Sequence, residues 1–338
     1  MKWIYHKPKF EYEVKFNDVN WAWAGHKFFA YDFVRNFKPK RIVELGTHKG
    51  TSFFSFCQAV KDEGLDSELN AIDTWKGDEH AGLYGEEIFD GVMDIKNSYY
   101  GSLNIKLIRK LFDDAVGAFE EGSIDLLHID GLHTYEAVKH DFETWLPKVC
   151  TDGVIFFHDI CEKTDDFGVY KLWAELKERY ATIEFDHSHG LGILFVNSGK
   201  IGELPVFEEI WKMYYESLIE KAILIDETES FAKKKDEEIS VLNEVIARKD
   251  EEILQKLVET AKKDEEVNIL NEEMVKERDD LRAQVAGLEK LLNDKIQEQN
   301  ERVQGLQDRV RILSEKLDIM NNLKVVKFLK KLKLLKIK

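Results

Sequence analysis

Three ionisable residues stand at the end of one apolar run in this sequence. The run that starts at Ile124 leads into HIDGLHTYEAVKHD, in which His128, Asp130 and His133 come just before a helix-like pattern. A carboxylate next to an imidazole can hold a metal ion or orient a general base. A capped turn at the start of a helix uses the same residue types for structural reasons alone. The stretch therefore predicts either the rim of an active site or a structural turn.

The segments around this stretch alternate between short apolar runs and helical patterns. The expected strands are RIVELG (41–46), LNAID (69–73), NIKLIRK (104–110), SIDLLHID (123–130) and GVIFFHD (153–159), followed by TIEFDHS (182–188) and GLGILFVN (190–197) as an antiparallel pair. This order predicts an α/β fold with a doubly wound, mostly parallel, seven-stranded sheet. Ligands bind outside the carboxyl ends of such strands, where Asp73, Asp130 and Asp159 each close a run.

The turn after the first predicted strand is typical of a ligand-binding loop. VELGTHKGTS places Glu44, Gly46 and Gly50 where the strand passes into a helix, whose free N–H groups face a ligand. Asp73, at the end of the next strand, is suited to accept hydrogen bonds from ribose hydroxyls. The G-x-G-x-x-G pattern of dinucleotide sites is absent, which favours a nucleoside cofactor without a pyrophosphate.

Four blocks together carry a resemblance to a known family. VELGTHKGTS, AIDTWKGDEHAG, SIDLLHIDGLHTYEAVKHDFETWLPKV and GVIFFHDI resemble the class I S-adenosylmethionine-dependent methyltransferases. The most similar group is the branch of macrocin O-methyltransferases and cephalosporin-hydroxylase-like proteins, which is linked to surface-polysaccharide modification. The resemblance runs from about Trp21 to Asn197.

The resemblance implies roles for particular residues. It places S-adenosylmethionine against the methionine-binding residues Glu44, Gly46, Thr47 and Gly50, the ribose acid Asp73, and the adenine-side acids Asp113 or Asp114. It also implies a divalent metal held by Asp130 and by the pair His158–Asp159. Relatives have two carboxylates at that pair, and an imidazole suits Mn²⁺, Fe²⁺ or Zn²⁺ better than Mg²⁺.

Methylation of a hydroxyl group needs a residue that takes the proton. His133 is the first choice of base, assisted by Asp130 on the same rim, whereas His128 is expected to be structural. Further candidates for the acceptor pocket are His80, His187 and His189, which also suit ordinary loop roles, and Trp75 and Tyr84, for which core packing is the alternative. We expect Glu136 and Asp141 to be solvated helix faces or caps.

The C-terminal part of the chain has a different pattern. After Pro205 the sequence has no further proline, and apolar residues recur at steps of three and four, the a/d seam of a coiled coil. One helix over about 230–320 would span about 135 Å; the alternative is a set of shorter helices folded back. The expected domains are a methyltransferase domain (1–205), a connecting helix (206–229), a coiled coil (230–322) and a basic amphipathic tail (323–338).

The last fifteen residues, KVVKFLKKLKLLKIK (324–338), hold seven lysines and no acid. Such a helix suits an anionic membrane surface. A basic end of the coil, or a contact with an acidic protein, would show the same composition.

Overall composition narrows the function further. The net charge of −16 excludes a general nucleic-acid binder. Cys57, Cys150 and Cys161 match no disulfide or metal-binding spacing and are expected to be buried free thiols. Without a signal peptide or a membrane-spanning run, we expect a cytoplasmic protein at the inner face of the membrane.

These observations predict an O-methyltransferase that acts on a saccharide hydroxyl, either free or lipid-linked. In its most specific form the enzyme caps a surface polysaccharide, and the coil sets distance or chain length. Two alternatives stay open. One is a methyltransferase for a small phenol or antibiotic sugar, with the coil serving only self-association. The other is a coiled-coil scaffold with a degenerate methyltransferase head.

Overall fold

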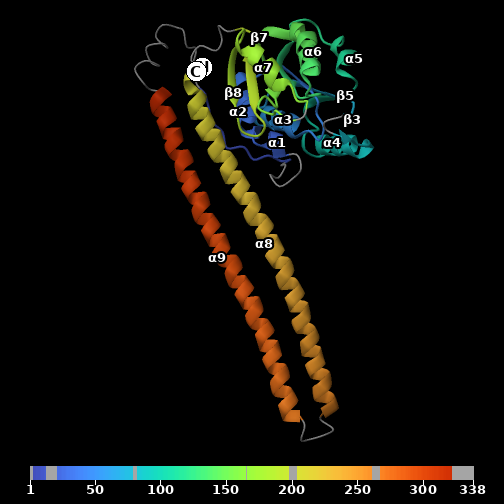
Figure 1. Ribbon diagram of the computed structural model, residues 1–338, viewed down its shortest axis with the longest axis vertical. Coiled ribbons are helices and arrows are strands. Elements are labelled where there is room, and N and C mark those ends of the chain that lie inside the picture. The colour runs from blue at the N-terminus through green and yellow to red at the C-terminus, as the bar shows by residue number, and fades with distance from the viewer. Residues whose placement is uncertain are drawn as a thin grey trace. The chain divides into compact units, whose positions relative to one another are not determined.

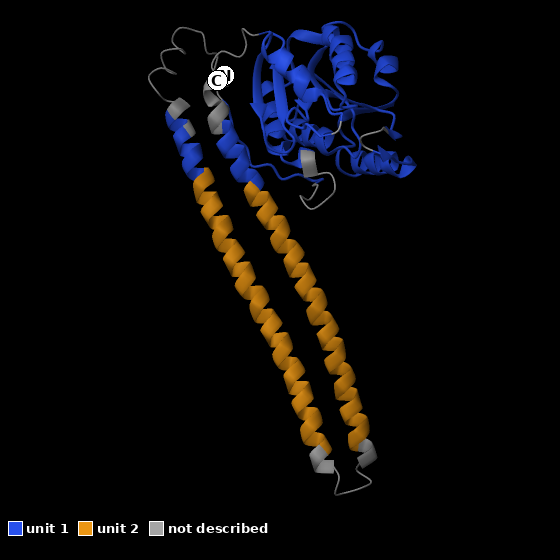
Figure 2. Cartoon of the chain, viewed as in Figure 1, with its two compact units in different colours: residues 1–219, 311–338 blue, residues 220–310 orange. Residues whose placement is uncertain are grey.

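The computed structural model divides the chain into two compact units (Figure 2). The first comprises residues 1–219 together with 311–338, and the second comprises residues 220–310. The described residues are 3–12, 21–78, 82–164, 166–197, 204–260 and 267–321. The basic segment 324–338 and His80 lie outside them.

A seven-stranded sheet forms the centre of the first unit (Figure 1). Its order is β5-β2-β1-β6-β7-β9-β8, and only β9 runs antiparallel to its neighbours, which confirms the predicted, mostly parallel sheet. The strands are β1 (Arg41–Leu45), β2 (Glu68–Asp73), β5 (Asn104–Arg109), β6 (Ile124–Ile129), β7 (Val149–His158), β8 (Ala181–Phe185) and β9 (Leu191–Phe195). A small ribbon of β3 (Gly77–Asp78) and β4 (Gly82–Leu83) was not foreseen.

Helices cover both faces of this sheet. They are α1 (Trp21–Ala24), α2 (Lys27–Phe37), α3 (Thr51–Glu63), α4 (Glu86–Tyr99), α5 (Phe112–Val116), α6 (Tyr135–Trp145) and α7 (Val169–Lys177). On β7, Phe156 meets Phe33 of α2, with ring centroids 4.9 Å apart. The next residue, Phe157, points to the opposite face and meets Trp173 of α7 at 5.7 Å. Burying each such ring contributes about 1.5–3 kcal/mol.

The aromatic helix ends where the sequence predicted. Lys38 follows α2 in the left-handed conformation with φ of 55°, and its N–H donates to the carbonyl of Val34. Pro39 disfavours the helical region for Lys38, so the helix cannot continue. Phe29, Tyr31 and Phe33 of α2 are buried, which confirms their predicted role in the core, whereas Phe28 and Phe37 are half-buried.

The chain changes direction across the sheet between β1 and β6. From β1 it proceeds to β2 and β5 on one side, then returns to β6 and β7 on the other. Gly46, directly after β1, has φ of 87°, and a Cβ atom there would lie 1.9 Å from the carbonyl oxygen of Asp130. Only glycine fits this approach, which brings the ends of β1 and β6 together.

Two long helices provide the second unit. Within residues 220–310, α8 (Leu204–Thr260) and α9 (Val267–Asn321) run antiparallel (Figure 1). Ion pairs join them, with Lys249 Nζ 3.5 Å from Glu277 Oε1 and Arg309 Nη1 3.4 Å from Glu220 Oε2. A single helix of about 135 Å is therefore not formed, because α8 ends at Thr260 and each arm spans about 85 Å. The regular a/d packing of a coiled coil remains a prediction.

The prediction of three buried free thiols is confirmed only in part. All three cysteines are free, but only Cys57 is buried; Cys150 is half-buried and Cys161 is exposed. None of the helices in the described parts of the chain has an apolar stretch long enough to cross a membrane.

We expect Gly46→Ala to lower the free energy of unfolding by about 3 kcal/mol or more, because the added methyl group meets the Asp130 carbonyl. Gly64→Ala is the matched control, since Gly64 also has positive φ but open space around it. Urea denaturation measures both variants. Equal losses would show that φ strain alone, and not the close approach, makes Gly46 necessary.

A zero-length carbodiimide should couple Lys249 to Glu277 within one chain, because their charged groups are in contact. Mass spectrometry of the monomer band on a denaturing gel detects this link, and Glu277→Gln removes it. Finding the Lys249–Glu277 link only in a dimer band would contradict the hairpin.

Candidate active site

A cavity of about 660 Å³ opens at the carboxyl ends of the strands. Loops that follow four neighbouring strands contribute to its wall, as does the end of β7. Among the lining residues are Trp23, Gly46, Thr47, His48, Lys49, Asp73, Tyr84, Leu111, Phe112, Asp130, Gly131, His133, His140, Asp141 and His158. The cavity lies at the switch point between β1 and β6, where an open α/β sheet binds its ligands.

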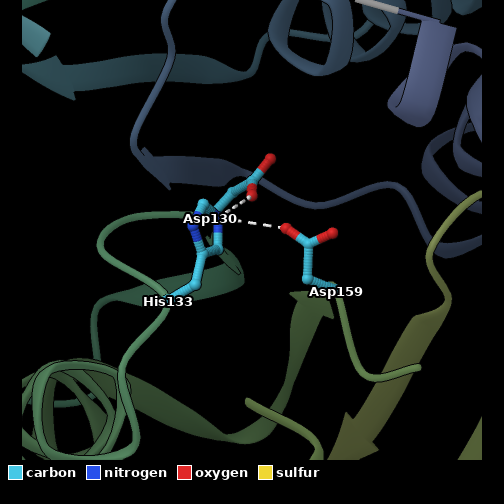
Figure 3. Close-up of side chains that lie close together, drawn as sticks. All are labelled: Asp130, His133 and Asp159. Atoms are coloured by element: carbon cyan, nitrogen blue, oxygen red, sulfur yellow. Dashed lines mark ion pairs between the residues drawn. The ribbon is translucent and has the colours of Figure 1, made fainter. Parts of the chain in front are cut away.

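Two carboxylates and two imidazoles meet at one side of this cavity. His133 Nε2 lies 3.0 Å from Asp159 Oδ2 and 3.5 Å from Asp130 Oδ1 (Figure 3). His158 Nδ1 lies 3.2 Å and 3.4 Å from the same two oxygens. Asp130 follows β6, and Asp159 follows β7 with φ of 59°. The four side chains form a cluster, here called the Asp–His cluster, in which His158 and Asp159 are buried and Asp130 and His133 are half-buried.

The charges in the Asp–His cluster stabilise one another. Burial alone would lower the pKa of His133, but the hydrogen bonds to Asp130 and Asp159 outweigh burial and raise it to about 9. The pKa of His158 is raised for the same reason. Burial opposes ionisation of the two carboxyls, yet the neighbouring imidazoles hold both pKa values below the usual range. At neutral pH the cluster therefore contains two negative and two positive charges.

This charge state restricts what His133 can do. An imidazolium donates a proton but cannot accept one, so His133 becomes a base only after it releases its own proton. A divalent cation bound to Asp130 and Asp159 would cause His133 to release its proton, because the cation would take the place of the protonated imidazoles beside the two carboxylates.

The donors in the cluster fit such a cation. Asp130, His133 and Asp159 each present one ligand atom, and these atoms lie within 4.8 Å of one another. His158, predicted as a ligand, presents Nδ1 to the same oxygens, and its Nε2–H donates to the carbonyl of Ser188 at 3.2 Å. This second hydrogen bond would fix the ring with Nδ1 free for a metal. Carboxylate and imidazole donors together suit Mn²⁺, Fe²⁺ or Zn²⁺.

The segment before α7 holds His133 in place. The Phe167 ring stacks on the His133 imidazole with centroids 4.7 Å apart and an angle of 2° between the planes. The N–H of Gly168 donates to the His133 carbonyl at 2.7 Å. Both the ring and the backbone of His133 are thus fixed.

A second buried chain of polar groups lies beside the cavity. Trp23 Nε1 donates to His128 Nε2 at 3.0 Å, so His128 carries its proton on Nδ1 and donates it to Glu44 at 2.9 Å. Glu44 is fully buried and is not among the residues that line the cavity. Its carboxylate thus contacts His128 in the described structure, while its predicted contact with the cofactor remains untested. The expectation that His128 is structural agrees with this geometry.

The predicted ribose acid already accepts three backbone hydrogen bonds. The N–H groups of Thr47 and His48 donate to Asp73 Oδ2, and the N–H of Trp75 donates to Oδ1 at 2.7 Å. A carboxylate has about four acceptor positions, so room remains for about one more donor. Gly46, Thr47 and Asp73 line the cavity, whereas Gly50 does not; Gly50 precedes α3 with φ of 82°.

The two acids predicted near adenine are not among the residues that line the cavity. Asp113 and Asp114 occupy the exposed first turn of α5, and Asp113 Oδ1 is 2.8 Å from His140 Nε2. Neither lines the cavity, which Leu111 and Phe112 contact instead. Asp141 does line it, although the sequence suggested a solvated position. Ala137 of the same helix also lines the cavity, and its spacing of four residues from Asp141 could have revealed the shared helix face.

Of the other described residues that were predicted for the acceptor pocket, Tyr84 lines the cavity and Trp75, His187 and His189 do not. Tyr84 lines the cavity and stacks on His48, with centroids 4.9 Å apart. Trp75 is buried against Phe89. His187 stacks on His26, and His189 Nδ1 lies 2.7 Å from Glu162 Oε2; neither histidine lines the cavity.

We expect Asp159→Asn to lower the pKa of His133 from about 9 by at least about one unit, because the nearer of its two anionic acceptors is removed. Histidine NMR titration measures this pKa, with His133→Gln used to assign the signal. Asp113→Asn should change only His140. An unchanged His133 titration in Asp159→Asn would contradict the charge balance of the Asp–His cluster.

Part of the first unit is similar to a known family of domains. Residues 43–160 match a family described as a methyltransferase domain, a range that contains the glycine turn and the Asp–His cluster. The uncharacterized protein y4gI of Sinorhizobium fredii (strain NBRC 101917 / NGR234) is 48% identical over 180 residues, which cover 53% of this chain. The chain spans only 20% of that relative's length.

Solved structures show a weaker likeness. The S-adenosylhomocysteine-bound methyltransferase PaMTH1 of Podospora anserina is 17% identical, with a TM-score of 0.39 over 50% of this chain and 76% of that chain. The O-methyltransferase TomG of Streptomyces achromogenes, solved with S-adenosylmethionine, is 14% identical, with a TM-score of 0.38 over 54% and 91%. These scores are too low to carry an argument. The sheet order and the match of residues 43–160 instead indicate a Rossmann-like methyltransferase fold in the first unit.

Proposed function

We propose that the chain is an S-adenosylmethionine-dependent O-methyltransferase whose acceptor is a hydroxyl group of a saccharide. One observation carries the proposal: a single cavity joins the glycine turn and Asp73 to Asp130 and His133. Cofactor-binding groups and proton-accepting groups therefore face the same space. Methyl transfer to oxygen needs both together.

Different residues of the cavity have different roles in the proposed reaction. S-Adenosylmethionine supplies an electrophilic methyl group, whose carbon–sulfur bond breaks as the acceptor oxygen attacks. Gly46 and Thr47 allow close approach of the cofactor, and Asp73 has one acceptor position left for a ribose hydroxyl. His133 Nε2 takes the proton that the acceptor hydroxyl loses. Phe167 keeps the imidazole oriented during that transfer.

A divalent cation would fit this scheme without displacing His133. Asp130, His158 and Asp159 would hold the cation, which acidifies a bound hydroxyl group. His133 would then lose its two anionic acceptors, and its pKa would return toward the ordinary value of about 6.5. A histidine with that pKa is suited to act as a base near neutral pH.

An aromatic surface in the cavity supports a saccharide acceptor. The stacked rings of His48 and Tyr84 both line the cavity, together with the ammonium-bearing side chain of Lys49. The apolar C–H faces of sugar rings pack on aromatic rings, and a lysine suits a phosphate or acidic sugar beside them. We extend the proposal to a lipid-linked glycan at the inner face of the membrane, reached through the basic segment 324–338. The long helices would then serve self-association.

Labelled S-adenosylmethionine, offered with lipid-linked glycans, free sugars and phenols, tests the acceptor class. We expect transfer to glycans, abolished by a metal chelator and restored by Mn²⁺. Transfer to phenols alone would favour the small-molecule alternative. Absence of S-adenosylhomocysteine binding in calorimetry would show a degenerate head and end the proposal.

Substitutions of the two cluster histidines should have different effects. We expect His133→Gln to lower kcat by about 10²- to 10⁴-fold without loss of Mn²⁺ binding, because a base and not a ligand is removed. His158→Gln should weaken Mn²⁺ binding instead, and His6→Gln, away from the cavity, should do neither. Loss of Mn²⁺ binding in His133→Gln would identify His133 as a ligand and leave the reaction without its assigned base.

A further inference from the structure

Asp141 of α6 is a buried acid in the cavity wall that the proposed reaction does not use. Only 7% of the residue is exposed, and it is one of the cavity-lining residues. A Cβ atom placed on Gly131 would lie 3.3 Å from Asp141 Oδ2 and 2.6 Å from the Phe112 ring. The carboxyl group, the aromatic ring and the bare backbone of Gly131 thus surround one part of the cavity. Within the described chain, no hydrogen-bond donor or ion-pair partner contacts this carboxyl.

The position of this part of the cavity relates it to the cofactor. Leu111 and Phe112 follow β5, and Gly131 follows β6, while Asp73 ends β2, the neighbour of β5. A nucleoside whose ribose reaches Asp73 can therefore extend its base between the loops after β5 and β6. These loops offer a flat apolar surface and one polar group, which is the combination that a purine base needs.

We propose that Asp141 recognises the Watson–Crick edge of adenine, accepting a hydrogen bond from the N6 amino group and donating one to N1. The inference rests on the proposed function, because it takes S-adenosylmethionine as the ligand. Asp113 and Asp114, the acids expected near adenine from the sequence, are exposed and outside the cavity wall. In this proposal Asp141, on α6, contacts adenine in place of Asp113 or Asp114, which lie on α5.

The protonation state of Asp141 suits a carboxyl group that donates as well as accepts. Burial raises the pKa of Asp141 to about 7, while His140 on the same helix opposes this and Asp113 on α5 adds to it. Below pH 7 the carboxyl group is protonated, and its O–H group can donate a hydrogen bond to N1. Above pH 7 only the contact with the N6 amino group remains, and the ionised form repels the lone pair of N1.

Asparagine reproduces the protonated acid, because its amide group both donates and accepts and does not titrate. Calorimetric binding of S-adenosylhomocysteine by the full chain at pH 6 and pH 8 is therefore a direct test. The wild-type affinity should fall about tenfold over this interval, as expected for loss of one hydrogen bond. Asp141→Asn should bind equally well at both pH values, and Asp113→Asn should behave as the wild type.

A second variant, Asp141→Leu, tests whether Asp141 contacts the N1 atom of adenine. The 1-deaza analogue of S-adenosylhomocysteine, which lacks N1, should bind the wild type more weakly than the parent ligand at pH 6. The leucine variant should bind both ligands equally weakly, and thermal melting verifies that it is folded. The same fall in affinity with pH in Asp141→Asn as in the wild type would overturn the inference while leaving the proposed function intact. Failure of the wild type to bind S-adenosylhomocysteine at all would overturn both.

Discussion

The pairing of two carboxylates, one buried and one half-buried, with two imidazoles is the interaction on which the site depends. Asp130 and Asp159 come from adjacent strand ends, and each would be unstable as a charge in this environment without His133 and His158. The cluster is neutral as a whole, so the protein can keep four ionised groups beside the cavity. It can also exchange two protons for one divalent cation without changing its net charge. The chemistry proposed for the cavity follows from that exchange.

Several contacts elsewhere in the fold hold the residues of this cluster in place. Gly46, directly after β1, allows its loop to approach the carbonyl of Asp130 closely, which places this glycine turn against the cluster. Phe167 and Gly168 fix His133 from the opposite side. The Trp23–His128–Glu44 chain pairs buried side chains of three different elements beside the cavity. These contacts link residues that are far apart in the sequence.

The sequence predicted the sheet and the acids at its strand ends because both follow from local patterns. Alternating periods identify the strands, and parallel strands place their carboxyl ends at one edge, which brings Asp73, Asp130 and Asp159 together. What depends on packing was not predictable in this way. Burial of Asp141 follows from how α6 lies on the cavity, and the antiparallel arrangement of α8 and α9 within residues 220–310 does not follow from the apolar spacing, which also suits one long helix. The protonation of His133 likewise requires knowing which carboxylates surround it.

The most direct test of the central claim is the number of protons released when a divalent cation binds. Calorimetric titration of Mn²⁺ at pH 7, repeated in buffers of different ionisation enthalpy, measures this number. If the cation replaces the protons of His133 and His158 at the two carboxylates, about two protons should leave per ion bound. Binding of Mn²⁺ without proton release, or no binding at all, would contradict the exchange on which the proposed chemistry rests.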